Sequence, residues 1–231
     1  MAECILVYGC GRASRADAHR EMAIHAMNNR LQSAGLPLIA PRNFAAVEVV
    51  DAVVLPRGKH RPPTALPALI ARQVYRLVTD ANARVRAIEA AAMSISTDTR
   101  IVIAHSWGSV AAYEALCLLP RHNVTHFLTL GSPLAIPVYV RGRLATFSAC
   151  GRHAWPRTVE WWCNFVDGRD PVAWWRLRRH FGDGTRIEER SIRLASGNPH
   201  KLSAYLACPE VIGALGRALL AGPSVVAEAA A

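Results

Sequence analysis

Residues 100–116 read RIVIAHSWGSVAAYEAL, and this stretch decides how the rest of the chain is arranged. The apolar run 101–104 has the length and β-branched content of a buried strand. The alanine-rich run after Gly108 favours a helix. Since only residues 105–108 separate the two, the sequence predicts a sharp turn that presents Ser106 at the end of a sheet.

Small residues flank this turn on both sides. Ala104, Ser106 and Gly108 match the nucleophile-elbow pattern G-x-S-x-G with alanine in the first position. The pattern is short, but it stands between a predicted strand and a predicted helix, which is the context that the motif requires. The alternative is a serine that caps the helix 107–118.

Length and composition predict one globular domain over residues 1–231. The chain is 52% hydrophobic, yet no uninterrupted apolar run approaches the roughly 20 residues of a membrane span. Its first residues, MAECILVYGCGR, enter a strand at once and lack the basic region of a signal peptide. Six cysteines form no C-x-x-C pair and no metal-ligand spacing, so we expect a reduced, cytoplasmic protein with no metal and no cofactor.

The net charge of +10 suggests an anionic partner. Arginine outweighs lysine in the second half of the chain, which favours carboxylate or phosphate groups. An anionic surface or an acidic carrier protein fits this charge, and a solvated basic face is the alternative. No nucleic-acid-binding motif is present, and we expect no nucleic acid partner. The arginines concerned are Arg141, Arg143, Arg152, Arg157, Arg176, Arg178, Arg179, Arg186, Arg190 and Arg193.

Apolar runs alternate with helical segments along the whole chain, which predicts an α/β fold with about six mostly parallel strands and helices on both faces. Proline-rich and irregular segments at 55–66 and 134–158 are candidate lids. The expected strands lie at 4–8, 47–50, 101–104, 126–130, 160–166 and 188–194. The expected helices lie at 15–34, 66–92 with a break near 79–80, 107–118, and 201–220 with an interruption at Pro209.

A glycine-rich turn, Gly9-Cys10-Gly11, follows the first strand. Glycine lets the backbone come close to a substrate above the sheet, so Gly9 and Gly11 are candidate substrate-binding positions. The backbone N–H of Cys10 is the candidate donor to an oxyanion, with Gly11 next. A plain steric need for glycine is the alternative, and the turn lacks the full dinucleotide fingerprint.

Three polar side chains follow predicted strands in the order Ser106, Asp170, His200. The carboxyl ends of parallel strands meet at one edge of a sheet, where functional loops gather. A serine hydroxyl needs a base, and a histidine base needs a carboxylate to fix its tautomer. Ser106, His200 and Asp170 are therefore the candidate nucleophile, base and acid.

Other residues compete for two of these roles. His180 is the second candidate base, whereas His105 is interpreted as structural and His122 and His126 lie at the wrong end of a strand. Asp167 competes with Asp170 for the acid. Asp170 is favoured because Pro171 after it restarts the chain as a rigid turn, and Asp167 is assigned to capping that turn.

Five segments resemble the α/β-hydrolase superfamily, and within it the small lipase-like and esterase-like members: ILVYGCG, IVIAHSWGS, FLTLGSPL, NFVDGRDPVA and NPHKLSAYL. The resemblance implies acyl transfer to water through an acyl-serine. It places the acid at Asp170, the base at His200, and an oxyanion hole at the N–H groups of Trp107 and Cys10. The chain departs from the family pattern at Tyr8, where histidine usually precedes the glycine.

The leading hypothesis is a serine hydrolase that cleaves a carboxylic ester or thioester of a small-molecule or lipid-like substrate. The alternatives are an acyltransferase or cyclase on the same fold, or a catalytically silent module that binds a membrane or an acidic partner. Trp174, beside arginines, is a candidate contact for lipid or an anionic group. Trp161 and Trp162 lie on a predicted strand, and we expect them mainly in the core.

Overall fold

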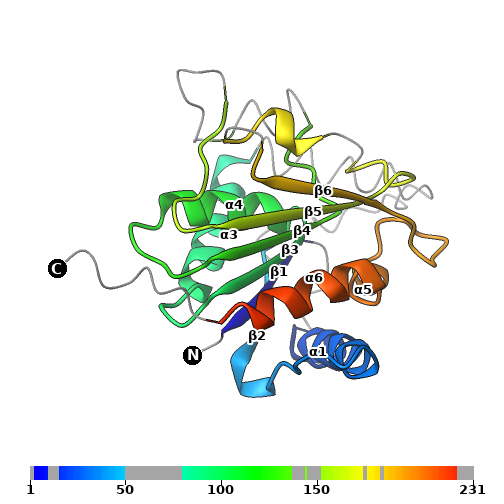
Figure 1. Ribbon diagram of the computed structural model, residues 1–231. Coiled ribbons are helices and arrows are strands. Elements are labelled where there is room, and N and C mark those ends of the chain that lie inside the picture. The colour runs from blue at the N-terminus through cyan, green and yellow to red at the C-terminus, as the bar shows by residue number, and fades with distance from the viewer. Residues whose placement is uncertain are drawn as a thin grey trace, which may run out of the picture.

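Six strands form one sheet in the order β2-β1-β3-β4-β5-β6, and every neighbouring pair is parallel (Figure 1). The computed structural model describes residues 3–9, 16–49, 80–136, 144, 152–173, 176–182 and 185–222. The predicted α/β class with six parallel strands is confirmed. The strands are β1 (Cys4–Gly9), β2 (Phe44–Glu48), β3 (Ile101–Ser106), β4 (His126–Leu130), β5 (Trp161–Asp167) and β6 (Ile187–Ile192).

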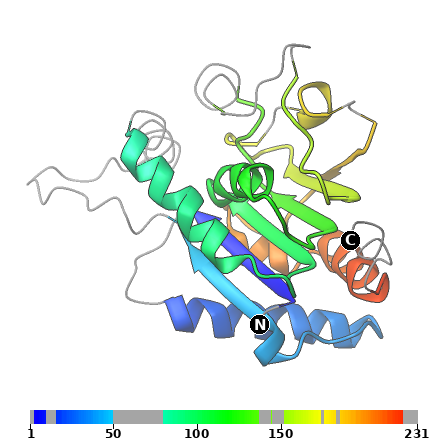
Figure 2. The same cartoon turned by 90° about the vertical axis from the view of Figure 1, so that its left-hand side faces the viewer.

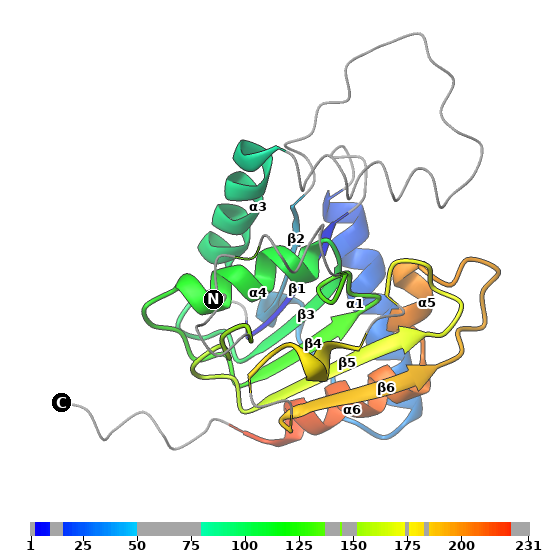
Figure 3. The same ribbon diagram turned by 90° about the horizontal axis from the view of Figure 1, so that it is seen from above.

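Helices cover both faces of this sheet (Figures 2 and 3). On one face lie α3 (Ala81–Ser94) and α4 (Gly108–Leu118), which share a hydrophobic core with the sheet. On the other face lie α1 (Ala16–Ser33), α5 (Leu202–Leu206) and α6 (Pro209–Leu220), with a second core of their own. Of two short 3-10 helices, η2 (Pro41–Asn43) directly precedes β2, and η4 (Leu177–Arg179) lies between β5 and β6 in the sequence.

The central strands are buried along their whole length. Every residue of β1, β3 and β4 is buried. This burial is the reason why these strands read as continuous apolar runs and not as alternating ones, since a parallel sheet has a covered face on each side. β2 ends at Glu48, two residues before the predicted end at Val50, which lies outside the described residues.

Local signals set the helix boundaries. Asp80 accepts a hydrogen bond from the N–H of Ala83 (2.9 Å) and so caps α3, at the position of the predicted break. Pro209 begins α6 and separates it from α5, as the sequence indicates. The candidate lid 55–66 lies outside the described residues, as does most of 134–158.

Trp162 is the centre of an aromatic cluster on the α4 face. Its side chain is fully buried and packs against Tyr113, Phe127, Phe181 and Trp155, with ring centroids 5.0 to 5.8 Å apart. The expectation that Trp162 belongs to the core is therefore confirmed.

The turn after β3 lies directly against β1. A Cβ atom on Gly9 would lie 2.7 Å from the Cβ of Trp107, and one on Gly108 would lie 2.7 Å from the Cα of Tyr8. Both distances are too short for real atoms, so the two backbones meet only because neither position carries a side chain. In the sheet register, Gly9 stands beside Ser106.

We expect Gly108→Ala to lower the free energy of unfolding by about 3 kcal/mol, because the added methyl group meets backbone that has no room to move. Gly213→Ala in α6 is the matched control, since a Cβ there meets nothing within 4 Å. That helical substitution should be neutral or stabilise the protein by up to about 1 kcal/mol. Urea denaturation measures both, and equal effects would contradict the close approach.

Candidate active site

Ser106 ends β3 with a left-handed backbone, φ 55°. It is the one residue other than glycine with positive φ in the described ranges. Such a conformation costs on the order of 1–3 kcal/mol and is retained where the surroundings impose it. Here Ser109 helps to impose it, because its hydroxyl donates a 2.6 Å hydrogen bond to the Ser106 carbonyl and lies 2.7 Å from the hydroxyl of Ser132.

The structure brings Ser106, His200 and Asp170 into one hydrogen-bonded chain. His200 Nδ1 lies 2.7 Å from Asp170 Oδ2, and His200 Nε2 lies 2.8 Å from Ser106 Oγ. A carboxylate only accepts, so Nδ1 carries the proton in this arrangement and Nε2 accepts from the serine hydroxyl. The residues are 94 and 30 positions apart in sequence. Sequence reasoning named all three.

Asp170 is fully buried and is held by donors from three directions. Besides His200, the N–H of Val172 donates to Oδ1 (2.9 Å) and the hydroxyl of Tyr205 donates to Oδ2 (3.1 Å). Tyr205 in α5 in turn accepts from the N–H of Asp167 (3.2 Å). Burial raises the pKa of Tyr205, which keeps its hydroxyl protonated and able to donate.

Space for the Asp170–His200 contact exists because residue 131 is glycine. A Cβ there would lie 2.9 Å from Asp170 Oδ2 and 3.2 Å from His200 Nδ1. Gly131 also has a left-handed φ of 54°, which favours glycine for a second reason. It directly follows β4, whose end therefore approaches the site through backbone alone.

Asp167, the competing carboxylate, has a different environment. Arg169 donates to it from its backbone N–H (2.9 Å) and from its guanidinium (2.6 and 3.0 Å), and the N–H of Leu194 donates at 2.8 Å. The Arg169 hydrogen bonds hold the pKa of Asp167 well below its usual range. Asp167 therefore closes its own turn, and in the described part of the chain its carboxylate accepts from Arg169 and Leu194.

His105 supports the loop that carries His200. Its Nε2 lies 3.1 Å from the backbone carbonyl of His200 and therefore donates to it, and the two rings are 4.9 Å apart. Burial, together with the nearby His200, lowers the pKa of His105 well below its ordinary value, so the ring is neutral. This geometry agrees with the structural role interpreted from the sequence.

The remaining candidate positions divide into described and undescribed residues. Gly9 lies beside Ser106, and Trp107 stands at the N-terminal end of α4, where helical N–H groups lack partners within the helix. His180 lies in η4's C-terminal turn, where its N–H bonds to the Leu177 carbonyl, and not in the Asp170–Ser106 chain. Cys10, Gly11 and Trp174 lie outside the described residues, so their roles stay predictions.

Sequence reasoning missed Tyr205, Gly131 and the Ser109–Ser132 pair as parts of the site. Gly131-Ser132-Pro133 reads as an ordinary turn, and Tyr205 sits in a helical pattern that suits a core residue. A signal existed for Gly131, since it follows a predicted strand at the same edge as the other candidates. No comparable signal marks Tyr205, because its role depends on how α5 packs.

Some arginine charge is neutralised within the fold. Arg169 pairs with Asp167, Arg190 with Glu188, and Arg84 with the fully buried Glu114. By contrast, η4 and the residue before it carry three exposed arginines. These are Arg176, Arg178 and Arg179.

Other classes of site find no support in the ranges that the structure describes. These residues contain no group of three or more histidine, cysteine or acidic side chains arranged for a metal ion. Their cysteines, Cys4, Cys117, Cys163 and Cys208, are free thiols. None of the described helices is long and apolar enough to cross a membrane.

No protein-family model matches the chain, and no curated protein matches it. Several solved structures are similar to the chain. The chain is similar to the esterase domain of a Rhodothermus marinus protein, with 16% identity, a TM-score of 0.43, and coverage of 93% of this chain and 86% of that one. It is similar to an esterase of Pyrococcus furiosus, with 12% identity, a TM-score of 0.40, and coverage of 96% and 85%.

A third solved structure is the thioesterase RedJ of the prodiginine pathway in Streptomyces coelicolor, with 19% identity, a TM-score of 0.34, and coverage of 94% and 86%. Two of these neighbours are named as esterases and one as a thioesterase. At such identities and scores, function has to come from the residues of this chain.

We expect Tyr205→Phe to lower the free energy of unfolding by about 1–3 kcal/mol, because it leaves the buried N–H of Asp167 without its acceptor. Tyr113→Phe is the matched control. Its hydroxyl donates a 2.7 Å bond to the carbonyl of Ala154, an exposed residue that water can reach. The control should cost about 1 kcal/mol or less. Chemical denaturation measures the free energy of unfolding of both variants. A smaller loss for Tyr205→Phe than for Tyr113→Phe would contradict the role of the Tyr205 hydroxyl between Asp167 and Asp170.

We expect Gly131→Ala to cost more stability than Gly35→Ala. Both glycines have positive φ, 54° and 66°, so both variants carry a backbone penalty of about 1–2 kcal/mol. Only position 131 adds a clash, since a Cβ on Gly35 meets nothing within 4 Å. Thermal and urea unfolding of the two variants should therefore differ by about 1–3 kcal/mol. Equal losses would mean that Asp170 has room to move aside.

Proposed function

We propose that this protein is a serine hydrolase that cleaves a carboxylic ester or thioester through an acyl-serine intermediate. The observation that supports it is the hydrogen-bonded chain from Ser106 Oγ through His200 to Asp170. Ser106 is the nucleophile in this proposal, His200 the base and Asp170 the acid. The chain matches the geometric requirement for an activated serine, a base within reach of the hydroxyl and a third group that orients the base.

The first half of the reaction follows from this proton arrangement. Ser106 Oγ attacks the carbonyl carbon while its proton passes to His200 Nε2, and the buried Asp170 carboxylate stabilises the imidazolium that results. The tetrahedral oxyanion is received by the N–H of Trp107 and, as predicted from the sequence, by that of Cys10. The imidazolium then gives its proton to the leaving alcohol or thiol, which departs and leaves an acyl group on Ser106.

The second half repeats these steps with water. His200 Nε2 takes a proton from water as the oxygen attacks the acyl carbon, and the same N–H groups receive the oxyanion. The imidazolium returns the proton to Ser106 Oγ, which releases the free acid. Asp167 takes no part in these reaction steps, because its carboxylate is paired with Arg169.

A fluorophosphonate probe tests the proposal, because it labels only an activated serine. We expect labelling of the wild type and none of Ser106→Ala or His200→Ala. Asp170→Asn should slow hydrolysis of p-nitrophenyl acetate by about 10⁴-fold, by analogy with serine proteases that lose their acid.

Asp167→Asn is the matched control, since it changes the neighbouring carboxylate of the same loop and should keep hydrolysis within about tenfold of the wild type. Product analysis in the presence of added alcohol separates hydrolysis from acyl transfer. Labelling that survives in Ser106→Ala, or a folded wild type that is never labelled, would overturn the proposed nucleophile.

A further inference from the structure

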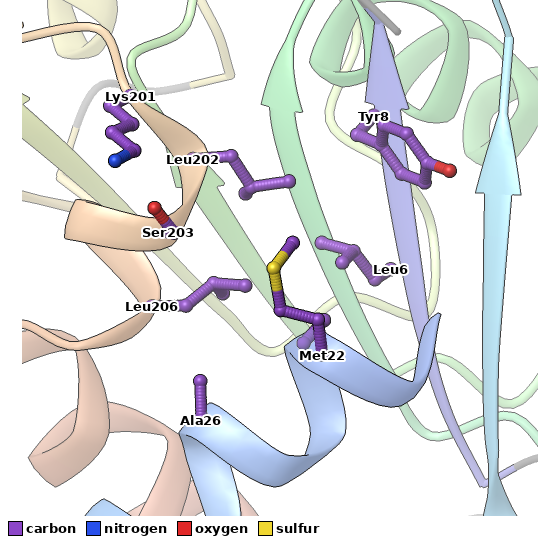
Figure 4. Close-up of a pocket in the computed structure, with 9 residues that line it drawn as sticks. Leu6, Tyr8, Met22, Ala26, Lys201, Leu202, Ser203 and Leu206 are labelled. Atoms are coloured by element: carbon purple, nitrogen blue, oxygen red, sulfur yellow. The ribbon is translucent and has the colours of Figure 1, made fainter. Parts of the chain in front are cut away.

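An apolar pocket of about 190 Å³ lies between α1 and α5, against the face of β1 (Figure 4). Leu6 of β1, Met22 of α1 and Leu202 of α5 point toward its interior, whereas the hydroxyl of Tyr8 points away from it (Figure 4). Ala26 and Leu206 complete its apolar wall. The pocket therefore has hydrocarbon on three sides.

Two properties distinguish this pocket from an ordinary packing defect. The pocket is open to solvent, because Met22 in its wall is 53% exposed and Ala26 in its wall is only half-buried. Its size is also sufficient for a ligand, since an apolar cavity of about 150 Å³ accepts benzene in another protein. An apolar guest would supply the contacts that these walls lack.

The pocket adjoins the candidate active site through the backbone. Lys201 and Leu202 in its wall directly follow His200. On the other side, Tyr8 in its wall precedes Gly9, which stands beside Ser106 in the sheet register. The pocket wall is therefore continuous along the backbone with the loop that carries His200 and with the strand end beside Ser106.

We infer that this α1–α5 pocket holds a linear alkyl chain of the ester substrate, about six to eight carbons long by comparison with the cavity that accepts benzene. The inference rests on the proposed hydrolase function and adds its substrate class, medium-chain aliphatic esters. Lys201, Ser203 and Tyr8 are the polar residues of a lining that is otherwise apolar, so the portion bound there is hydrocarbon. Burial of each methylene should raise kcat/KM about fourfold until the pocket is full.

The acyl half or the alkoxy half of an ester can supply such a chain, and two series of substrates distinguish them. One series lengthens the acyl chain from p-nitrophenyl acetate to the octanoate. The other lengthens the alcohol from ethyl acetate to octyl acetate. We expect kcat/KM to rise with each added methylene in one of the two series and to stay nearly constant in the other.

Ala26→Phe fills the pocket from the surface of α1, and Met22→Trp blocks it from a second position. Each should lower kcat/KM for the preferred eight-carbon ester at least tenfold and leave the two-carbon ester within twofold. His25→Phe is the matched control, since it places the same aromatic group on an exposed neighbour outside the pocket. Circular dichroism checks that each variant folds. Unchanged chain-length profiles in both filled variants would overturn the inference.

Direct binding separates failure of the pocket from failure of the proposed chemistry. Isothermal titration of Ser106→Ala with sodium octanoate should show binding that Ala26→Phe removes and His25→Phe retains. Octanoate binding with that pattern, in a protein that fluorophosphonate never labels, would count against the hydrolase and not against the pocket. Normal labelling without octanoate binding would count against the pocket alone.

Discussion

The close approach of two backbones, β1 and the turn after β3, is the constraint on which the site depends. Neither Gly9 nor Gly108 has room for a side chain, because each lies directly against the opposite segment. The turn is thereby pressed against the strand, and Ser106 has to take a left-handed backbone at its tip. The free-energy cost of this backbone conformation is small compared with the stabilisation from packing of β1 and β3, which are buried throughout. The orientation of one hydroxyl thus follows from two adjacent strands that are buried throughout.

Burial of a carboxylate sets the second requirement. Asp170 has no exposed surface, and an ionised group in that position is tolerated only when hydrogen bonds replace water. Val172, His200 and Tyr205 provide them from a loop, from the segment before α5 and from α5 itself. The same hydroxyl that stabilises Asp170 also joins it to the Asp167 turn. The position of the His200 ring therefore depends on the packing of α5.

The sequence was sufficient for features that depend on local pattern. Apolar runs located β1, β3 and β4, and the order of Ser106, Asp170 and His200 placed three groups at one edge of the sheet. The sequence favoured Asp170 and kept Asp167 as a competitor, because both stand in the same polar turn and only the position of His200 distinguishes them. Tyr205 and the α1–α5 pocket were beyond prediction, since each exists only once separate helices have packed against the sheet.

The wide separation of the site residues along the chain has a consequence for folding. Ser106, Asp170 and His200 meet only after β3, β4 and β5 have paired side by side and α5 has packed beside them. Parallel pairing closes long loops before it yields contacts, which makes it a slow and late event. A fragment that lacks one of these strands cannot assemble this hydrogen-bonded chain. Reactivity of this hydroxyl would thus report the last stage of refolding, when the sheet is complete.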